Sequence, residues 1–119
     1  MKVPGVFRNA TDTRSIPAGT TIFAEGESGS EMYGVVEGMV ELRSNGHVIA
    51  ELGPDDVFGE MALVDSSPRM ASAVATADTV LAVIDRRSFL FLIHETPTFA
   101  LQVMSAMADR LRRQARPTG

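Results

Sequence analysis

The chain has 119 residues, about the length of one domain, and its 45% hydrophobic and 22% charged residues are typical of a folded globular protein. Its net charge of -4 argues against a general binder of nucleic acid or of anionic membranes, because both need a basic surface. The absence of cysteine excludes disulfides, thiolate metal sites and cysteine nucleophiles.

The N-terminus gives no sign of export. Residues 1–10 contain no apolar segment of the kind that forms a signal peptide. The longest stretch without a formal charge, residues 96–108, is too short and too polar to span a bilayer. We therefore expect a soluble protein of the cytoplasm.

From Ile16 to Asp85 the chain consists of short apolar segments separated by turn residues. The predicted strands are residues 20–24, 32–36, 39–43, 47–52, 71–76 and 79–84. Asn45-Gly46 predicts a type I′ hairpin turn, because both residues tolerate a positive φ. No crossover helix fits between the first strands, so the pattern favours an antiparallel roll or sandwich over a parallel sheet.

After Asp85 the pattern becomes helical. An apolar run at residues 88–94 predicts one helix, with Asp85 as its N-cap. Thr96 and Pro97 then predict the start of a second helix that ends at about Ala115. The predicted fold class is therefore mainly β with flanking helices, an antiparallel β-roll over about residues 16–85 and C-terminal helices over about 86–115. We expect residues 1–119 to form a single domain.

The second helix has an unusually wide apolar face. Its polar positions share one narrow stripe because they are three or four residues apart: Thr98, Gln102, Ser105, Asp109 and Arg112. The rest of its surface is apolar or small, except for Arg110. Such a helix either lies deep in its own core or contacts a partner, most simply a second copy of the chain. We favour the partner.

The irregular segment between residues 57 and 72 holds the residues that could bind a ligand. Arg69 is the only Lys or Arg between Ser44 and Asp85. An isolated Arg among acids is most often half of a weak surface ion pair. Here, however, the small residues that follow it leave room beside the guanidinium. Gly59 precedes a predicted one-turn helix at 60–63, whose N-terminal N–H groups could bind an anion together with Arg69 and the Ser72 hydroxyl.

This segment resembles the phosphate-binding cassette of the cyclic nucleotide-binding domain family, which includes the catabolite activator protein, the regulatory subunits of protein kinase A and cyclic-nucleotide-gated channels. The family pattern is matched by Phe58-Gly59-Glu60-Met61-Ala62-Leu63 and by Pro68-Arg69-Met70-Ala71-Ser72. The resemblance extends from about Ile16 to Arg112. It implies a roll of the jelly-roll type, also called a double-stranded β-helix, that binds a cyclic nucleotide as its ligand and needs no further cofactor and no metal.

The resemblance also assigns the phosphate to particular residues. Arg69 would pair with the oxygens of the cyclic phosphate. The N–H of Ala62, the backbone of Ala71 and the side chain of Ser72 would complete the phosphate site. One Arg is sufficient because a cyclic phosphodiester carries a single negative charge.

The sugar and the base would lie beside the phosphate. Gly59, with Met61 following in the cassette, would allow close approach of the sugar, and Glu60 would accept a hydrogen bond from the ribose 2′-OH. Leu42 and Ile49 occupy positions that line the base pocket in the family, although they are equally expected as plain core residues.

Met70 departs from the family pattern. Relatives that prefer cGMP often carry Thr at this position, and the catabolite activator protein carries Ser. Methionine has no hydroxyl, so we expect cAMP to be preferred over cGMP. The residues that cover the base in the family would fall near Arg113 and Gln114.

Other constellations indicate no chemistry. His47 and His94 lie on no spacing typical of metal ligands, and the sequence has no Ser–His–Asp arrangement, P-loop or dinucleotide fingerprint. Our leading interpretation is a cyclic-nucleotide sensor that is not an enzyme and binds neither nucleic acid nor membrane. We expect a homodimer or larger homo-oligomer through the last helix, with an unidentified effector protein as a further partner.

Three alternatives belong to other classes. A degenerate family member would keep the roll and serve only for dimerisation or protein interaction. A transcription factor would carry the same domain as its sensor fragment. An enzyme built on a jelly roll lacks candidate catalytic residues.

Overall fold

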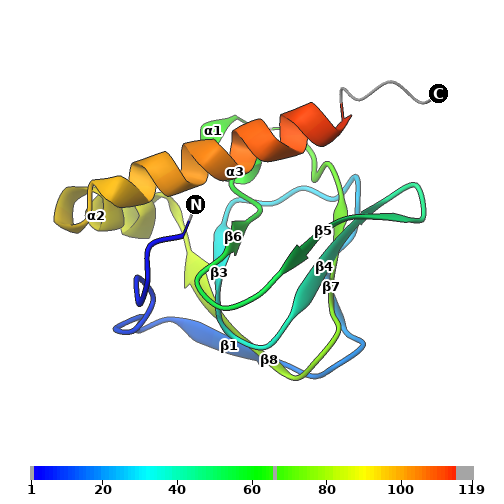
Figure 1. Ribbon diagram of the computed structural model, residues 1–119, viewed down its shortest axis with the longest axis horizontal. Coiled ribbons are helices and arrows are strands. Elements are labelled where there is room, and N and C mark those ends of the chain that lie inside the picture. The colour runs from blue at the N-terminus through cyan, green and yellow to red at the C-terminus, as the bar shows by residue number, and fades with distance from the viewer. Residues whose placement is uncertain (1, 66, 115–119) are drawn as a thin grey trace.

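The protein folds as a β-roll of two antiparallel sheets followed by helices (Figure 1). The structure is a computed structural model, and it describes residues 2–65 and 67–114, with the backbone alone for residues 113 and 114. One sheet has the strand order β1-β8-β3-β6, and the other has the order β2-β7-β4-β5. The strands are β1 (Thr13–Ile16), β2 (Thr21–Phe23), β3 (Met32–Glu37), β4 (Val40–Ser44), β5 (His47–Leu52), β6 (Val57–Phe58), β7 (Ser72–Ala75) and β8 (Thr79–Ile84). The helices are α1 (Met61–Val64), α2 (Arg86–Glu95) and α3 (Thr98–Gln114).

The first sheet is covered on both faces. Successive side chains of a strand point to opposite sides of the sheet. From β3 and β8, Tyr33 and Leu81 therefore enter the core between the two sheets, whereas Met32 and Ile84 enter a second core beneath the helices. Because both of their faces are buried, β3 and β8 are almost continuously apolar. In β4 the second face is more exposed, so apolar and polar residues alternate along the strand.

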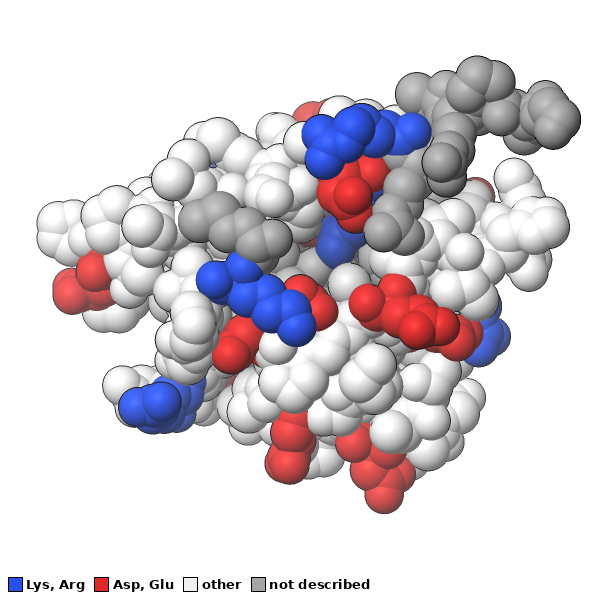
Figure 2. All heavy atoms as spheres, in the orientation of Figure 1, with Lys and Arg blue, Asp and Glu red and all other residues white. Residues whose placement is uncertain are grey.

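The helices and the N-terminal segment close one side of the roll (Figure 1). Phe7 packs edge-on against Phe99 of α3, with ring centroids 5.9 Å apart. The side-chain amide of Gln102 accepts a hydrogen bond from the Val3 N–H and donates one to the Asp55 carbonyl at 2.6 Å. Both charge signs are interspersed on the face drawn in Figure 2, where the described Lys and Arg side chains form no extended basic area.

The predicted β-roll and its hairpin turn are confirmed. Asn45 and Gly46 have φ values of 53° and 79°, as a type I′ turn requires, and β5 has the predicted bounds. Two strands were not predicted. The strand β1 is mostly exposed and polar, and β6 consists of only two residues that pair with β3.

The helix predictions are confirmed with two corrections. Asp85 is the N-cap of α2, and its side chain accepts a hydrogen bond from the Ser88 N–H at 2.8 Å. Thr96, predicted as the N-cap of the last helix, is instead the C-cap of α2. Gln102, which we assigned to the polar stripe of α3, is buried because it joins the N-terminal segment to the turn before β6.

The wide apolar face of α3 is divided between core and solvent. Phe99 and Val103 are buried, whereas Leu101, Met104 and Leu111 are each more than half exposed. The interpretation that this face is sunk deep in the core is therefore wrong for these three residues. They are solvent-exposed apolar side chains in the single chain.

Candidate functional site

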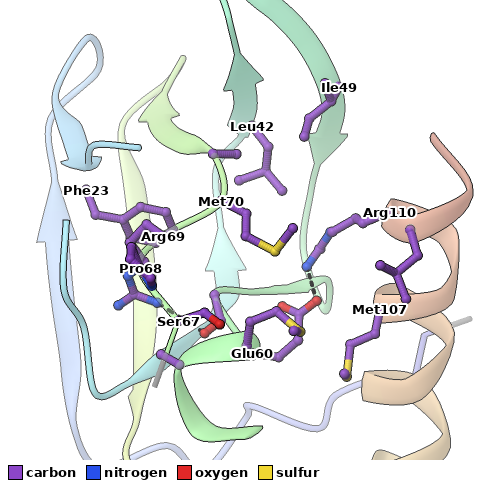
Figure 3. A pocket seen from close by; sticks show the side chains of 15 residues that line it. Phe23, Leu42, Ile49, Glu60, Ser67, Pro68, Arg69, Met70, Met107 and Arg110 are labelled. Carbon is purple, nitrogen blue, oxygen red and sulfur yellow. Dashed lines mark hydrogen bonds and ion pairs between the residues drawn. The ribbon is translucent and has the colours of Figure 1, made fainter. Parts of the chain in front are cut away.

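The cassette residues surround one pocket between the roll and α3 (Figure 3). Gly59 joins β6 to α1 with a φ of +77°, a conformation that side chains larger than hydrogen disfavour. Nine of the ten predicted ligand-binding residues line this pocket: Leu42, Ile49, Gly59, Glu60, Met61, Ala62, Arg69, Met70 and Ala71. Ser72 is not among the lining residues. Its hydroxyl accepts a hydrogen bond from the Glu25 N–H at 2.9 Å.

Arg69 is a buried cation held by backbone carbonyls. Its side chain donates to the carbonyl of Gly59 at 3.1 Å and to the carbonyl of Glu31 at 2.9 Å, and the guanidinium lies 4.1 Å from the centroid of the Phe23 ring. The residue is 8% exposed, and its Nε has no hydrogen-bond partner. None of the ion pairs among the described residues includes Arg69.

The loop before β3 fixes the position of Arg69. The Arg69 N–H donates to the Glu27 carbonyl, and the Gly26 N–H donates to the Arg69 carbonyl, both at 2.8 Å. A Cβ at Gly29 would come within 2.3 Å of the Arg69 guanidinium, so this position must be glycine for the side chain to lie where it does. Nothing in the local sequence around Gly29 indicates that a distant side chain will cross it.

Glu60 is paired with α3. The residue is 2% exposed, and one of its carboxylate oxygens accepts a hydrogen bond from Arg110, whose second terminal nitrogen donates to the Val57 carbonyl. The other oxygen of Glu60 has no partner. Arg110 is a site residue that was not predicted from the sequence. The feature of the sequence that could have indicated its role is that Arg110 is the single charged residue on the apolar side of this helix.

The remaining predicted residues serve the pocket in different ways. The N–H of Ala62, predicted to bind phosphate, makes a hydrogen bond of 3.3 Å to the Gly59 carbonyl. Leu42 is buried, and Ile49 packs against the core between the sheets, so both line the pocket and belong to the core. The side chains of Arg113 and Gln114, predicted to cover the base, lie outside the described residues.

Tyr33 lies near Arg69, whose guanidinium is 5.9 Å from the centroid of the Tyr33 ring. Burial, followed by the nearby Glu31 carboxylate, raises the pKa of the Tyr33 phenol. The phenol therefore stays protonated and donates to Glu31 at 3.1 Å.

Among the described residues there is no cluster of metal-ligating side chains, and no helix of that part of the chain has the length and apolar character to cross a membrane.

The structure is thus a β-roll with a buried Arg and a buried Glu at one pocket. A family model described as "Cyclic nucleotide-binding domain" matches residues 13–96. The chain therefore belongs to the cyclic nucleotide-binding domain family.

Individual relatives agree with this assignment. The chain is 39% identical over 104 residues to the cyclic AMP receptor protein of Thermus thermophilus, covering 83% of this chain and 48% of the relative. It is 32% identical over 102 residues to a CRP-like cAMP-activated global transcriptional regulator of Mycobacterium tuberculosis, covering 82% of this chain and 46% of the relative. The chain thus spans about half the length of these two relatives.

A solved structure of this family also has a similar fold. The crystal structure of the Thermus thermophilus catabolite activator protein superimposes with a TM-score of 0.74 at 37% sequence identity, covering 94% of this chain and 56% of that chain. The predicted roll with C-terminal helices is therefore the fold of this family.

Proposed function

We propose that the chain is a cyclic-nucleotide sensor module that binds cAMP more tightly than cGMP. The observation that carries this proposal is a pair of buried, oppositely charged side chains at one pocket, each with an unpartnered polar atom. Arg69 Nε is an unused donor, and Glu60 has an unused acceptor oxygen. Buried polar atoms are rarely left unpaired in proteins, so a ligand with both an anionic oxygen and a hydroxyl would complement this pocket.

A cyclic nucleotide has this combination of groups. We assign its phosphate to Arg69, with the N–H of Ala62 and the backbone of Ala71 as further contacts. The Ser72 hydroxyl is assigned only as a donor from outside the pocket lining, because it already accepts a hydrogen bond from the Glu25 N–H. We assign the ribose 2′-OH to Glu60, beside Gly59. An ordinary mononucleotide with two charges on its phosphate is a worse match, because Arg69 is the only cation assigned to the phosphate and Glu60 repels additional negative charge.

The preference for cAMP is proposed from Met70 and from the relatives. Met70 is 42% exposed at the pocket and offers no hydroxyl to guanine. The names of the Thermus and Mycobacterium relatives refer to cyclic AMP. We propose the same ligand for this chain, in a regulatory and not a catalytic role.

A sensor must transmit the binding of its ligand to another element of the protein or to a partner molecule. The three exposed apolar side chains of α3 are consistent with a homodimer formed along this helix, and an effector protein remains a proposed partner. The Mycobacterium relative is named as a transcriptional regulator, which favours a sensor portion of such a protein as the second candidate.

Calorimetric titration of the purified chain tests the proposal. We expect cAMP to bind, cGMP to bind about tenfold more weakly, a difference of about 1.4 kcal/mol, and 5′-AMP to bind least. 5′-AMP is the matched control because it carries the same base and sugar with an open phosphate. The absence of binding by all three ligands would overturn the proposed function.

A further inference from the structure

Arg69 contacts an aromatic ring as well as the two carbonyls that accept its hydrogen bonds. Its guanidinium carbon lies 4.1 Å from the centroid of the Phe23 ring and 5.9 Å from that of the Tyr33 ring. Phe23 is buried and lines the pocket. Figure 3 shows it beside Arg69, on the side of the pocket away from α3. The face of an aromatic ring is electron-rich, so it attracts a cation, and the attraction is stronger where water is excluded.

The ring and the carbonyls leave part of the guanidinium free. The N–H groups of an arginine lie in one plane, and attraction to a ring face needs none of them. The carbonyls of Gly59 and Glu31 accept hydrogen bonds from the two terminal nitrogens, whereas Nε has no partner. Phe23 can therefore fix the position of Arg69 without competing with an anion for its donors.

Phe23 belongs to a cluster of three rings that joins the two sheets. It comes from β2, whereas Tyr33 and Phe58 come from β3 and β6 of the other sheet. The ring centroids lie 5.3 Å to 6.1 Å apart, and Phe58 is fully buried. Rings in a close-packed core have few alternative positions. The cluster therefore holds the Phe23 ring rigidly beside the guanidinium.

The position of the guanidinium sets how well the site can bind an anion. Arginine has many rotamers, and holding it in one of them costs conformational entropy. If only a fraction of the molecules hold the guanidinium in the binding position, the apparent affinity falls in proportion to that fraction. A ring that holds Arg69 in place before the ligand arrives therefore raises the affinity without contacting the phosphate.

We propose that Phe23 is a positioning residue for the phosphate: the electron-rich face of its ring holds the Arg69 guanidinium where a cyclic nucleotide binds. The inference rests on the proposed function and adds a residue to its site. The role depends on the charge of the ring face and not only on the volume of the ring. A change in that charge at nearly constant shape should therefore weaken binding.

Replacing Phe23 by trifluorophenylalanine in the full chain makes this change. Fluorine draws electron density from the ring face and weakens its attraction for a cation, while the ring keeps nearly the same shape. We expect the Kd for cAMP, measured by calorimetry, to rise by about threefold to tenfold. The matched control is the same replacement at Phe58, a ring of the same cluster that is not one of the two rings in contact with Arg69. Its Kd should stay within about twofold of the unsubstituted chain.

A second ligand separates positioning of Arg69 from direct contact with the base. The phosphate is common to cAMP and cGMP, so the fluorinated Phe23 ring should weaken both by the same factor and leave their ratio unchanged. Phe23→Leu removes the ring face altogether and should weaken both ligands at least as much as fluorination. Circular dichroism verifies that each protein is folded.

The outcomes distinguish this inference from the proposed function. If cAMP binds and the fluorinated Phe23 ring leaves its Kd unchanged, the inference is overturned while the proposed function stands. Equal losses from fluorination at Phe23 and at Phe58 would also overturn it, because they would show an effect of core packing. A loss for one nucleotide alone would overturn it in favour of a contact with the base. If the unsubstituted chain binds neither cAMP nor cGMP, the proposed function fails and the inference fails with it.

Discussion

A single side chain, Arg69, shows how strongly the roll is organised around one charge. A guanidinium that is 8% exposed and has no carboxylate partner among the described residues is costly to bury. Its cost is offset by two backbone carbonyls, by the face of Phe23 and by the space that Gly29 leaves. The residue is therefore held in place before any anion arrives.

Arg69→Ala should remove most of the affinity for cAMP. Losing one partner of a buried charge contact costs about 2–5 kcal/mol, which is a loss of roughly 30-fold or more in Kd. Arg69→Lys should also bind poorly, because an ammonium group lacks the planar fork. The measurement is calorimetric titration, with Arg43→Ala as the control, since Arg43 pairs with Glu41 outside the pocket lining. Undiminished cAMP affinity in Arg69→Ala would falsify the phosphate assignment.

Glu60 should determine how the ribose hydroxyl is recognised. We expect 2′-deoxy-cAMP to bind more weakly than cAMP, because the unpartnered oxygen of Glu60 then gains no donor. In Glu60→Ala the difference between the two ligands should shrink. Comparing both ligands on both proteins isolates this contact from general effects of the substitution. If the wild-type difference persists in Glu60→Ala, another group contacts the sugar.

At the scale of elements, α3 is joined to the cassette through charged and polar contacts as well as apolar ones. Arg110 reaches Glu60 and Val57 near the end of the helix, and Gln102 reaches the Asp55 carbonyl nearer its start. Each contact connects α3 to residues 55–60, which include β6 and the start of the cassette. A change at Glu60 therefore alters a bond that holds the helix.

Arg110→Met should destabilise the fold because it leaves the Glu60 carboxylate buried without its cation. The expected loss is about 3–5 kcal/mol, and replacing both residues (Arg110→Met with Glu60→Gln) should restore part of it. Urea unfolding followed by circular dichroism measures the free energy of unfolding of the single and the double variant. The control is Arg112→Met on the same helix, where the side chain is exposed and should contribute less than about 1 kcal/mol. Equal losses in the Arg110 and Arg112 variants would contradict this role.

The N-cap of α2 should make stability depend on acid pH. Hydrogen bonding to the Ser88 N–H lowers the pKa of Asp85, so the ionised cap stabilises the folded state above the unfolded pKa. This contribution is lost as the pH falls through the lowered folded value. We expect Asp85→Ala to lower Tm at neutral pH, and the difference from wild type to shrink at strongly acidic pH.

Asp85→Asn is the matched control for that experiment. Asparagine caps a helix about as well as aspartate but does not titrate. The Tm of Asp85→Asn at neutral pH should stay near that of the wild type. As the pH falls, its Tm should decrease less than that of the wild type, because the contribution of Asp85 ionisation is absent. A difference between Asp85→Ala and wild type that is constant across the whole pH range would contradict the assignment.

At the scale of the whole molecule, folding leaves several large apolar side chains of α3 exposed to solvent. Leu101, Met104 and Leu111 follow one another along the exposed side of α3 at intervals of three and seven residues. A stripe of this kind can pack against its own copy across a two-fold axis. It is the surface on which we expect the chain to associate.

Met104→Glu together with Leu111→Glu should therefore yield a monomer, because the charges would be buried in the contact. Light scattering with and without cAMP gives the mass, and any change on adding cAMP means that the two states differ in affinity for it. The control is Leu90→Glu with Phe91→Glu, which places the same two charges at exposed apolar residues of α2. A wild-type chain that is monomeric at high concentration with and without cAMP would eliminate the dimer.

By itself, the sequence determined the local features of this protein. The apolar periodicity, the Asn45-Gly46 turn and the Asp85 cap are each decided by neighbouring residues, and the structure confirms them. The cassette could likewise be read as one segment, because its residues are close in sequence. The short strand β6 could not, because two residues form a strand only where another strand already provides hydrogen bonds.

Only the tertiary structure decided which distant residues meet. The contact of Arg110 with Glu60 spans 50 positions, and the glycine that accommodates the Arg69 guanidinium lies 40 positions before it. The sequence places Gln102 among polar residues, yet it is buried because the N-terminal segment folds back over α3 and satisfies its amide. Local preferences can fix a turn or a cap, but burial and hydrogen-bond satisfaction depend on segments that only the folded chain brings together.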